Sequence, residues 1–274
     1  MLIVARDRER GEATVSEIRS VSGNVRVKLL LADLSRQADI RRLAIEVHAR
    51  TDRLDVLVNN AGGFSVDRQL TVDGIEQTFA VNHLAYFLLT SLLLDLLVAG
   101  APSRIVNVAS DAHRLARLDL DDLQGEREYK AGRAYALSKL ANVLFTRQLA
   151  RRLDGTGVTA NAVHPGGVTT NIWNHGPFWL RWVIRVARPF MLTSEQGAEG
   201  IIRLATAPEL DGVTGKYFNR TTEVEPSPAA LENTNARRTR PIRESPAPPQ
   251  GVCTANTRTP RPHTTPPPAP PTPP

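Results

Sequence analysis

The sequence predicts an α/β fold: a doubly wound, mostly parallel sheet covered by helices on both faces, in a three-layer α/β/α arrangement. Two observations predict it. Short apolar runs alternate with longer helix-like stretches over most of the chain. The 274 residues, 41% of them hydrophobic, also suffice for one domain of about 200–250 residues with a single core.

Five apolar runs have the length and composition of buried strands: residues 2–5, 25–34, 54–62, 104–110 and 158–166. The stretches between them are predicted as helices, at residues 7–20, 36–51, 73–99 and 132–153. Strands that alternate with helices form βαβ units, and their runs are apolar throughout because helices cover both faces of the sheet.

A change of composition at Pro226 divides the chain into two predicted parts. Residues 1–225 are expected to fold, whereas residues 226–274 hold most of the 20 prolines and are expected to form a disordered tail. Much of the net charge of +6 comes from arginines of this tail. The charge is therefore weak evidence for nucleic-acid binding, and none is expected.

The single cysteine, Cys253, excludes a disulfide within the chain and a Cys-rich metal site. The sequence shows no secretory leader, and no apolar run reaches the roughly 20 residues of a membrane span. We therefore expect a cytoplasmic protein without a bound metal.

The stretch AYALSKLAN at residues 134–142 is the strongest candidate for chemistry. On a helix, Tyr135 and Lys139 are four residues apart and project from one face. A neighbouring ammonium group lowers the pKa of a phenol from its usual value of about 10, which would make Tyr135 an acid or base near neutral pH. Alone, the pattern more often marks a solvated pair on a helix surface.

Three other stretches favour the chemical interpretation. Ser110 ends the apolar run RIVNVAS, and ligands bind at the carboxyl ends of strands in open α/β sheets. The small residues of NNAGG at 59–63 let a ligand approach the backbone. Asn82 lies inside an apolar stretch, where a buried amide needs a partner. Taken singly, these features would be a strand-end cap, a turn and a satisfied core asparagine.

Together the motifs resemble the short-chain dehydrogenase/reductase (SDR) family. NNAG at 59–62, Asn82, Ser110, Tyr135-x-x-x-Lys139 and PGGVTT at 165–170 occur in the order of that family. Longer stretches, such as VARDRERGEA, SDAH and YALSKLANVLFTRQLARRL, resemble its retinol dehydrogenase-like branch. The resemblance covers residues 1–235 and implies a Rossmann-like fold and hydride transfer with a nicotinamide cofactor.

The resemblance also implies a role for each matching residue. Tyr135 would give a proton to a carbonyl or take one from an alcohol, Lys139 would lower its pKa and hold the nicotinamide ribose, and Ser110 would hold the substrate oxygen. Asn82 would complete a proton relay through a water molecule. The other matches would contact the cofactor: Asn59, Ala61 and Gly62 beside the adenosine ribose, Asp33 and Leu34 at the adenine, and Pro165, Gly166 and Thr170 in the loop that closes on the nicotinamide.

Arg6 bears on the choice of cofactor. An acidic residue at the end of this strand reads the ribose 2′-hydroxyl of NAD(H), whereas an arginine accommodates the 2′-phosphate of NADP(H). The chain has Arg6 there and Arg10 one turn later, and the arginine fork suits a phosphate. NADP(H) is therefore favoured and NAD(H) is the alternative; a solvated first-turn arginine would favour neither.

The chain opens at MLIVARDRERG, which resembles the second strand of the family. The family's first strand and its TGxxxGxG turn, which binds the pyrophosphate, have no counterpart in the sequence. That strand is central in the sheet order 3-2-1-4-5-6. We therefore expect a sheet in two halves with unpaired strand edges, and impaired cofactor binding.

The segment at about 171–199 corresponds to the family's substrate lid, and its tryptophans and phenylalanines suit a lipophilic alcohol or carbonyl of retinoid, steroid or aldehyde type. The arginines of this segment would also allow peripheral contact with a membrane surface. Packing of the lid onto the body explains the same residues at least as well. The LFTRQLARRL stretch is expected to be a packing face of its helix. Its resemblance to a helix that forms part of the family's dimer interface implies a homodimer.

Two other functions compete with the oxidoreductase hypothesis. One is a non-catalytic relative that keeps the site residues and serves as an interaction module, which the binding of cofactor would distinguish. The other is a sugar-nucleotide epimerase or dehydratase, which shares the YxxxK pattern. The NNAG motif and the lack of a large C-terminal substrate domain argue against it.

Overall fold

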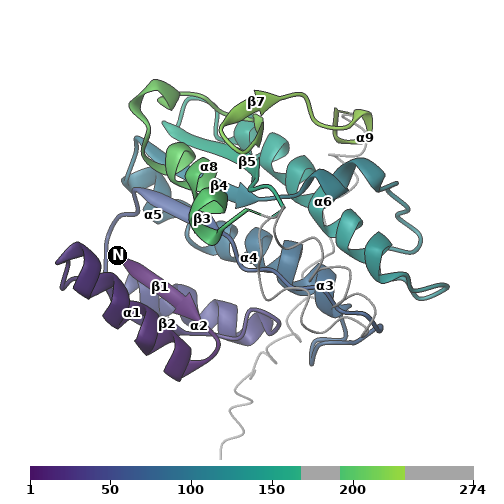
Figure 1. Cartoon of the computed structure of the whole chain (residues 1–274), viewed down its shortest axis with the longest axis horizontal. Coiled ribbons are helices and arrows are strands. Elements are labelled where there is room, and N and C mark those ends of the chain that lie inside the picture. The colour runs from purple at the N-terminus through teal and green to yellow at the C-terminus, as the bar shows by residue number, and fades with distance from the viewer. Residues whose placement is uncertain (168–191, 232–274) are drawn as a thin grey trace, which may run out of the picture. The chain divides into compact units, whose positions relative to one another are not determined.

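The strands form two separate sheets in the computed structural model, which describes residues 1–167 and 192–231 (Figure 1). A two-stranded parallel sheet pairs β1 (Leu2–Ala5) with β2 (Lys28–Leu31). A second sheet has the order β3 (Val56–Asn59), β4 (Ser103–Val108), β5 (Val158–His164), β6 (Tyr217–Asn219) and β7 (Thr222–Val224). Only β7 runs antiparallel to its neighbour. The five predicted strands are present, and so is the expected interruption between β1 and β3.

The predicted helices are also present, with one break that the sequence did not reveal. They are α1 (Arg8–Ser22), α2 (Gln37–His48) and α6 (Ala131–Arg152). The expected helix over 73–99 is divided into α3 (Gln77–Phe79), a π-helical turn (Ala80–Leu84), α4 (Ala85–Leu92) and α5 (Leu94–Ala99). Three further helices follow strand ends or cover the sheet: a 3-10 helix (Asp111–Leu115), α8 (Ser194–Thr206) and α9 (Pro228–Leu231), with a 3-10 turn at Pro208–Leu210.

Side-chain alternation along β4 shows that helices cover both faces of the larger sheet. Ile105 packs with Leu149 and Leu153 in the cluster under α6. Val106, the next residue, packs with Leu204 of α8. Because successive side chains of a strand point to opposite faces, α6 and α8 lie on opposite faces of the sheet. The predicted three-layer α/β/α arrangement is therefore confirmed.

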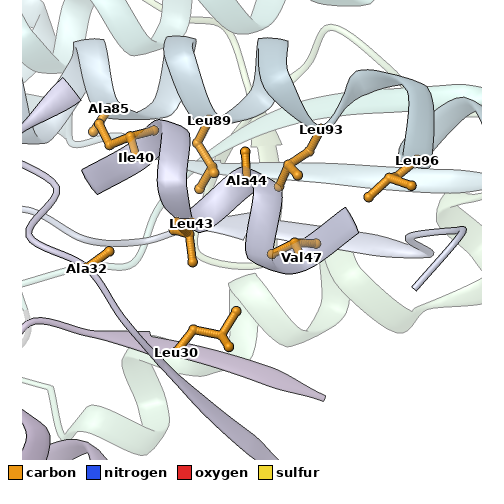
Figure 2. Close-up of a cluster of buried hydrophobic side chains, with 10 residues drawn as sticks. All are labelled: Leu30, Ala32, Ile40, Leu43, Ala44, Val47, Ala85, Leu89, Leu93 and Leu96. Carbon is orange, nitrogen blue, oxygen red and sulfur yellow. The ribbon is translucent and has the colours of Figure 1, made fainter. Parts of the chain in front are cut away.

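One apolar cluster joins the two-stranded sheet to the remainder of the unit (Figure 2). Leu30 of β2 and Leu43 of α2 belong to the same buried cluster as Leu89 and Leu93, on the α4–α5 side. Within the part of the chain that the structure describes, no strand pairing connects the two sheets, so this apolar cluster, with α2 at its centre, holds them together.

One predicted boundary needs correction, and another stays a prediction. Residues 194–199, expected at the end of the lid, begin α8, where Thr193 and Gln196 form a capping box, and their part in a lid stays a prediction. Residues 226–231, expected in the disordered tail, fold onto the body, with Ala230 only 1% exposed. The apolar residues around α9 outweigh the local effect of its prolines. The other parts of the predicted lid and tail, residues 168–191 and 232–274, lie outside the described residues.

His113 fastens the segment before α9 to the end of β4. Its ring is fully buried, with Nδ1 lying 2.8 Å from the carbonyl oxygen of Ser110 and Nε2 accepting a hydrogen bond of 3.0 Å from the backbone N–H of Ser227. Since Nε2 accepts, Nδ1 carries the proton of a neutral ring. His113 therefore has a structural role.

We predict that Leu43→Ala destabilises the fold by about 2–5 kcal/mol, because it opens a cavity at a fully buried position. It should loosen β1 and β2 more than β4 and β5, since the cluster joins the two sheets. Hydrogen exchange checks this, with Leu144→Ala, at an equally buried position in the α6 cluster, as control. A uniform increase of exchange in both variants would contradict the assigned role.

We also predict that the free energy of unfolding falls as the pH is lowered. Burial lowers the pKa of His113 in the folded protein, so between that value and about 6.5 the unfolded chain binds more protons. Stability from the neutral ring is therefore present above about pH 6.5 and lost below it. Burial also lowers the pKa values of His83 and His164, so they act in the same direction.

The comparison with His113→Gln isolates this residue, because a glutamine amide donates and accepts without titrating. Denaturant unfolding at about pH 7.5 and about pH 5.5 should show a smaller loss of stability in the variant. An equal loss in both proteins would show that His113 does not contribute.

Candidate active site

Lys139 lies on α6 with its ammonium group inside the protein. The residue is 3% exposed, and Nζ donates a hydrogen bond of 3.1 Å to the carbonyl oxygen of Val108, near the end of β4. Burial lowers the pKa of Lys139 to about 8. Its Nζ is 5.6 Å from the centroid of the Tyr135 ring. The predicted pair on one helix face is therefore present, but it is buried and not a solvated surface pair.

The pKa of Tyr135 differs from the expectation. Burial raises it above its usual value, and a hydrogen bond between the side chains of Tyr135 and Ser110 offsets only part of this effect. Lys139 is not among the causes that shift the pKa of Tyr135, and its ammonium is directed to the carbonyl of Val108. At neutral pH, Tyr135 is thus a phenol that can donate a proton.

Ser110 follows β4 and begins the 3-10 helix Asp111–Leu115. Its Oγ accepts a hydrogen bond of 3.2 Å from the backbone N–H of Ala112, while its side chain also hydrogen-bonds with Tyr135. The end of a parallel strand thus places a hydroxyl beside the phenol, and the expected contact of Ser110 with a substrate oxygen stays a prediction.

Asn82 sits in the π-helical turn and is completely buried. Its amide pairs with the backbone of Gly63, accepting from N–H at 2.7 Å and donating to C=O at 3.0 Å. The same amide donates to Oγ of Ser138 at 3.1 Å. The expected partner of a buried asparagine is therefore the loop after β3, and π-helical turns of this kind occur frequently at functional sites.

Gly62 brings the backbone close to these groups. A Cβ atom at this position would lie 3.4 Å from Oδ1 of Asn82 and 3.7 Å from Nζ of Lys139. The carbonyl oxygen of the neighbouring Ala61 accepts a hydrogen bond of 2.7 Å from the hydroxyl of Tyr86. Because glycine has no side chain, the backbone at Gly62 is compatible with the predicted close approach of a ligand.

The side chain of Asn59 serves the sheet. It is 4% exposed, and its Nδ2 donates to Oδ1 of Asn107 at 2.8 Å and to Oγ1 of Thr90 at 3.0 Å. Both partners lie inside the domain. The structure thus gives this side chain a structural role, and the expected contact of Asn59 with the ribose stays a prediction.

The predicted cofactor residues of the first two strands share one edge of the small sheet. Arg6 follows β1 and is exposed, while Asp33 and Leu34 follow β2 and are partly buried. The N–H of Ala32 donates to the carbonyl of Ala5 at 3.1 Å, so the two strand ends lie side by side. Oδ1 of Asp33 accepts from the N–H of Ser35 at 3.0 Å, which fixes the turn.

Pro165 and Gly166 follow β5 at the carboxyl edge of the larger sheet. Gly166 has φ of 94°, a conformation that requires glycine here. The N–H of Leu192 donates to the carbonyl of Gly167 at 2.9 Å, so residues 167 and 192 lie together. Thr170 lies outside the described residues.

Several polar residues near the site were not predicted. Asp111 accepts hydrogen bonds of 3.0 Å from the hydroxyl of Tyr217 and from Nδ2 of Asn219. Nε2 of His164 lies 3.8 Å from the same carboxylate. His164 and Asn219 are the last residues of β5 and β6, and Asp111 lies three residues after β4; these positions near strand ends are the signal that could have indicated them. Asn142, the last residue of the AYALSKLAN stretch, also had no predicted role.

The described residues also bear on two other kinds of site. They contain no group of three or more His, Cys, Asp or Glu side chains placed to hold a metal ion. None of the helices formed by these residues combines the length and apolar character needed to cross a membrane.

Comparison with known proteins identifies the family. Residues 1–177 match the profile of the short chain dehydrogenases. Human retinol dehydrogenase 12 is 44% identical over 237 residues, which cover 86% of this chain and 74% of the relative. A solved structure of an uncharacterised Mycobacterium paratuberculosis protein is 31% identical with a TM-score of 0.67, covering 86% of this chain and 80% of that one.

A structure of Pseudomonas aeruginosa RhlG in an active-site complex with NADP is 26% identical with a TM-score of 0.58, covering 84% of this chain and 86% of that one. The chain belongs to the short-chain dehydrogenase/reductase family and is a retinol dehydrogenase-like, NAD(P)-dependent oxidoreductase.

Proposed function

We propose that this protein transfers a hydride between NADP(H) and a lipophilic alcohol or carbonyl compound of retinoid, steroid or aldehyde type. The observation that carries the proposal is the environment of Tyr135. Its phenol hydrogen-bonds with Ser110, and its ring lies 5.6 Å from the buried ammonium of Lys139.

The protein residues supply the proton side of the reaction. Because burial raises the pKa of Tyr135, its phenol is protonated at neutral pH and donates a proton to a substrate carbonyl. The hydroxyl of Ser110 donates a second hydrogen bond to the same oxygen. When bound, the nicotinamide supplies or accepts the hydride. In the direction of alcohol oxidation, the same phenol must first lose its proton.

The residues present fit a phosphorylated dinucleotide. The absence of a side chain at Gly62 leaves the backbone beside Lys139 open to a ligand, and Lys139 would hold the nicotinamide ribose. The exposed Arg6, beside the turn at Asp33, would hold the 2′-phosphate. The complex of the neighbouring structure RhlG with NADP supports the choice of NADP(H) over NAD(H).

The substrate class rests on the relatives and on the sequence. The name retinol dehydrogenase 12 supports a retinoid-like substrate, and the aromatic residues of 171–191 support a lipophilic one. Peripheral membrane contact, a homodimer and a cytoplasmic location remain parts of this proposal. Vesicle co-sedimentation, light scattering and cell fractionation test these three points separately.

We predict that Tyr135→Phe lowers the turnover of a retinoid aldehyde by at least about 100-fold, since it removes the proton donor. The affinity for NADPH should remain within about threefold, because the ring and Lys139 are kept. Steady-state kinetics and calorimetry measure the two quantities.

The control is Tyr129→Phe, which removes a hydroxyl that donates to Ser65 and Glu76 and does not touch Ser110 or Lys139. Its turnover should stay within about threefold of the natural protein. Retained turnover in Tyr135→Phe would contradict the assignment of Tyr135 as the acid.

We predict that Arg6→Ala weakens NADPH binding by about 10-fold or more, because charge-assisted hydrogen bonds to the 2′-phosphate are lost. Binding of NADH should be unchanged. Arg8→Ala is the matched control, since among the described residues Arg8 forms an ion pair only with the exposed Glu12. Equal losses for NADPH and NADH would contradict the role of Arg6. Failure of the natural chain to bind either dinucleotide would favour the alternative of a non-catalytic interaction module.

A further inference from the structure

Asn142 is a completely buried polar residue that has no role in the proposed chemistry so far. It lies on α6, three residues after Lys139. Its Nδ2 donates to the carbonyl oxygen of Asn82 at 2.8 Å and is 3.3 Å from the carbonyl oxygen of Val108. Its Oδ1 is 3.0 Å from Nδ1 of His83.

These contacts connect the segments that carry the four candidate catalytic residues. The carbonyl of Asn82 belongs to the π-helical turn, and the carbonyl of Val108 stands two residues before Ser110. Asn142 itself is on the helix of Tyr135 and Lys139. One amide thus joins the turn, the strand end and the helix.

The carbonyl of Val108 is shared between two donors. Nζ of Lys139 donates to it at 3.1 Å, and Nδ2 of Asn142 lies 3.3 Å away. The amide therefore limits how much of this acceptor is available to the ammonium. Because a hydrogen bond to the charged form of a lysine favours that form, the amide also affects the ionisation of Lys139.

The orientation of the amide is fixed from its other side. Since Nδ2 donates to carbonyl oxygens, Oδ1 must accept, and Nδ1 of His83 must carry a proton. The His83 ring packs against Phe79 and Phe145, with centroid distances of 5.2 Å and 6.1 Å. Burial lowers the pKa of His83 to about 4, so the ring stays neutral. A flipped amide would face two carbonyl oxygens with its own oxygen.

We propose that Asn142 is a positioning residue, whose amide holds the Asn82 turn and the Val108 carbonyl in register around the Lys139 ammonium. The proposal rests on the proposed oxidoreductase function, because it assigns Asn142 to the same site. Its effect passes through Lys139 and Asn82, and Asn142 itself touches no reacting atom.

The test compares Asn142→Leu and Asn142→Asp in the full chain. Both variants have a similar size to asparagine and lack the amide donor, but one is apolar and the other acidic. The matched control is Asn161→Leu. Asn161 is also buried, and its amide donates to the carbonyl of Val213 at 2.7 Å and accepts from the N–H of Lys216 at 3.0 Å, on the strand β5.

The first measurement does not depend on turnover. The chain has four lysines, Lys28, Lys130, Lys139 and Lys216, so ¹³C-labelled lysine gives few NMR signals, and Lys139→Arg assigns one of them. We expect the Lys139 titration to move upward by about 0.5 pH unit or more in both Asn142 variants, because the ammonium gains the Val108 carbonyl for itself. It should not move in Asn161→Leu. An unchanged Lys139 titration in the folded Asn142 variants would overturn the proposal.

The second measurement is steady-state turnover of a retinoid aldehyde with NADPH. We expect kcat to fall by about 10-fold or more in both Asn142 variants while KM stays within about threefold, and Asn161→Leu to keep its kcat. A loss of kcat that is equal in Asn161→Leu would overturn the proposal, because it would follow from stability alone. If the natural chain shows no turnover while Lys139 still responds to Asn142, the proposed function fails and the positioning role stands.

Discussion

The burial of the Lys139 ammonium is the constraint on which the rest of the site depends. A charged group that is 3% exposed requires a hydrogen-bond acceptor inside the protein, and the carbonyl of Val108 provides it. This acceptor is available only if β4 and α6 meet at a fixed register. The apolar contacts of Ile105 with Leu149 and Leu153 hold that register from the sheet side. Packing of the core thus determines where the charge lies.

The same burial determines the acid–base character of the site. A solvated ammonium would favour the phenolate of Tyr135, but here both groups are withdrawn from water. Each is therefore driven toward its neutral form, the phenol of Tyr135 and the amine of Lys139. The hydrogen bond with Ser110 lowers the pKa of Tyr135 and so opposes the effect of burial on the phenol. It has no such effect on Lys139. The pair is consequently better suited to giving a proton than to taking one until another charge enters the site.

Periodicity made the central elements of the fold predictable. The runs that became β4 and β5 are apolar because both faces are covered, and the Tyr135–Lys139 spacing belongs to a helix. The π-helical turn at Ala80–Leu84 was not predictable, because one inserted residue leaves no mark in the pattern of a mostly apolar helix. The short strands β6 and β7 and helix α9 are stabilised by tertiary contacts and have no clear local sequence pattern, so they were not predicted.

The direction in which a side chain points at the end of a strand could not be predicted from the sequence. Asn59 and Ser110 both follow or end a strand, yet one side chain enters the sheet and the other reaches the phenol. Their difference follows from the alternation along neighbouring strands, which fixes Asn59 opposite Asn107 in the β3–β4 register. The hydrogen bond between His113 and Ser227 joins residues that are 114 apart along the chain, and no sequence pattern predicts it.

The buried amides explain why the site needs more than apolar packing. Asn59 donates to Asn107, Asn107 to Oγ1 of Thr146, and Thr146 to the carbonyl of Asn142, whose own amide reaches Asn82. Apolar residues of the same shape could make the sheet and helices equally stable, since exchanging both partners of a hydrogen bond costs little. They would not fix the helix along its axis. A series of directional bonds does fix it, and a proton transfer requires positions of that accuracy.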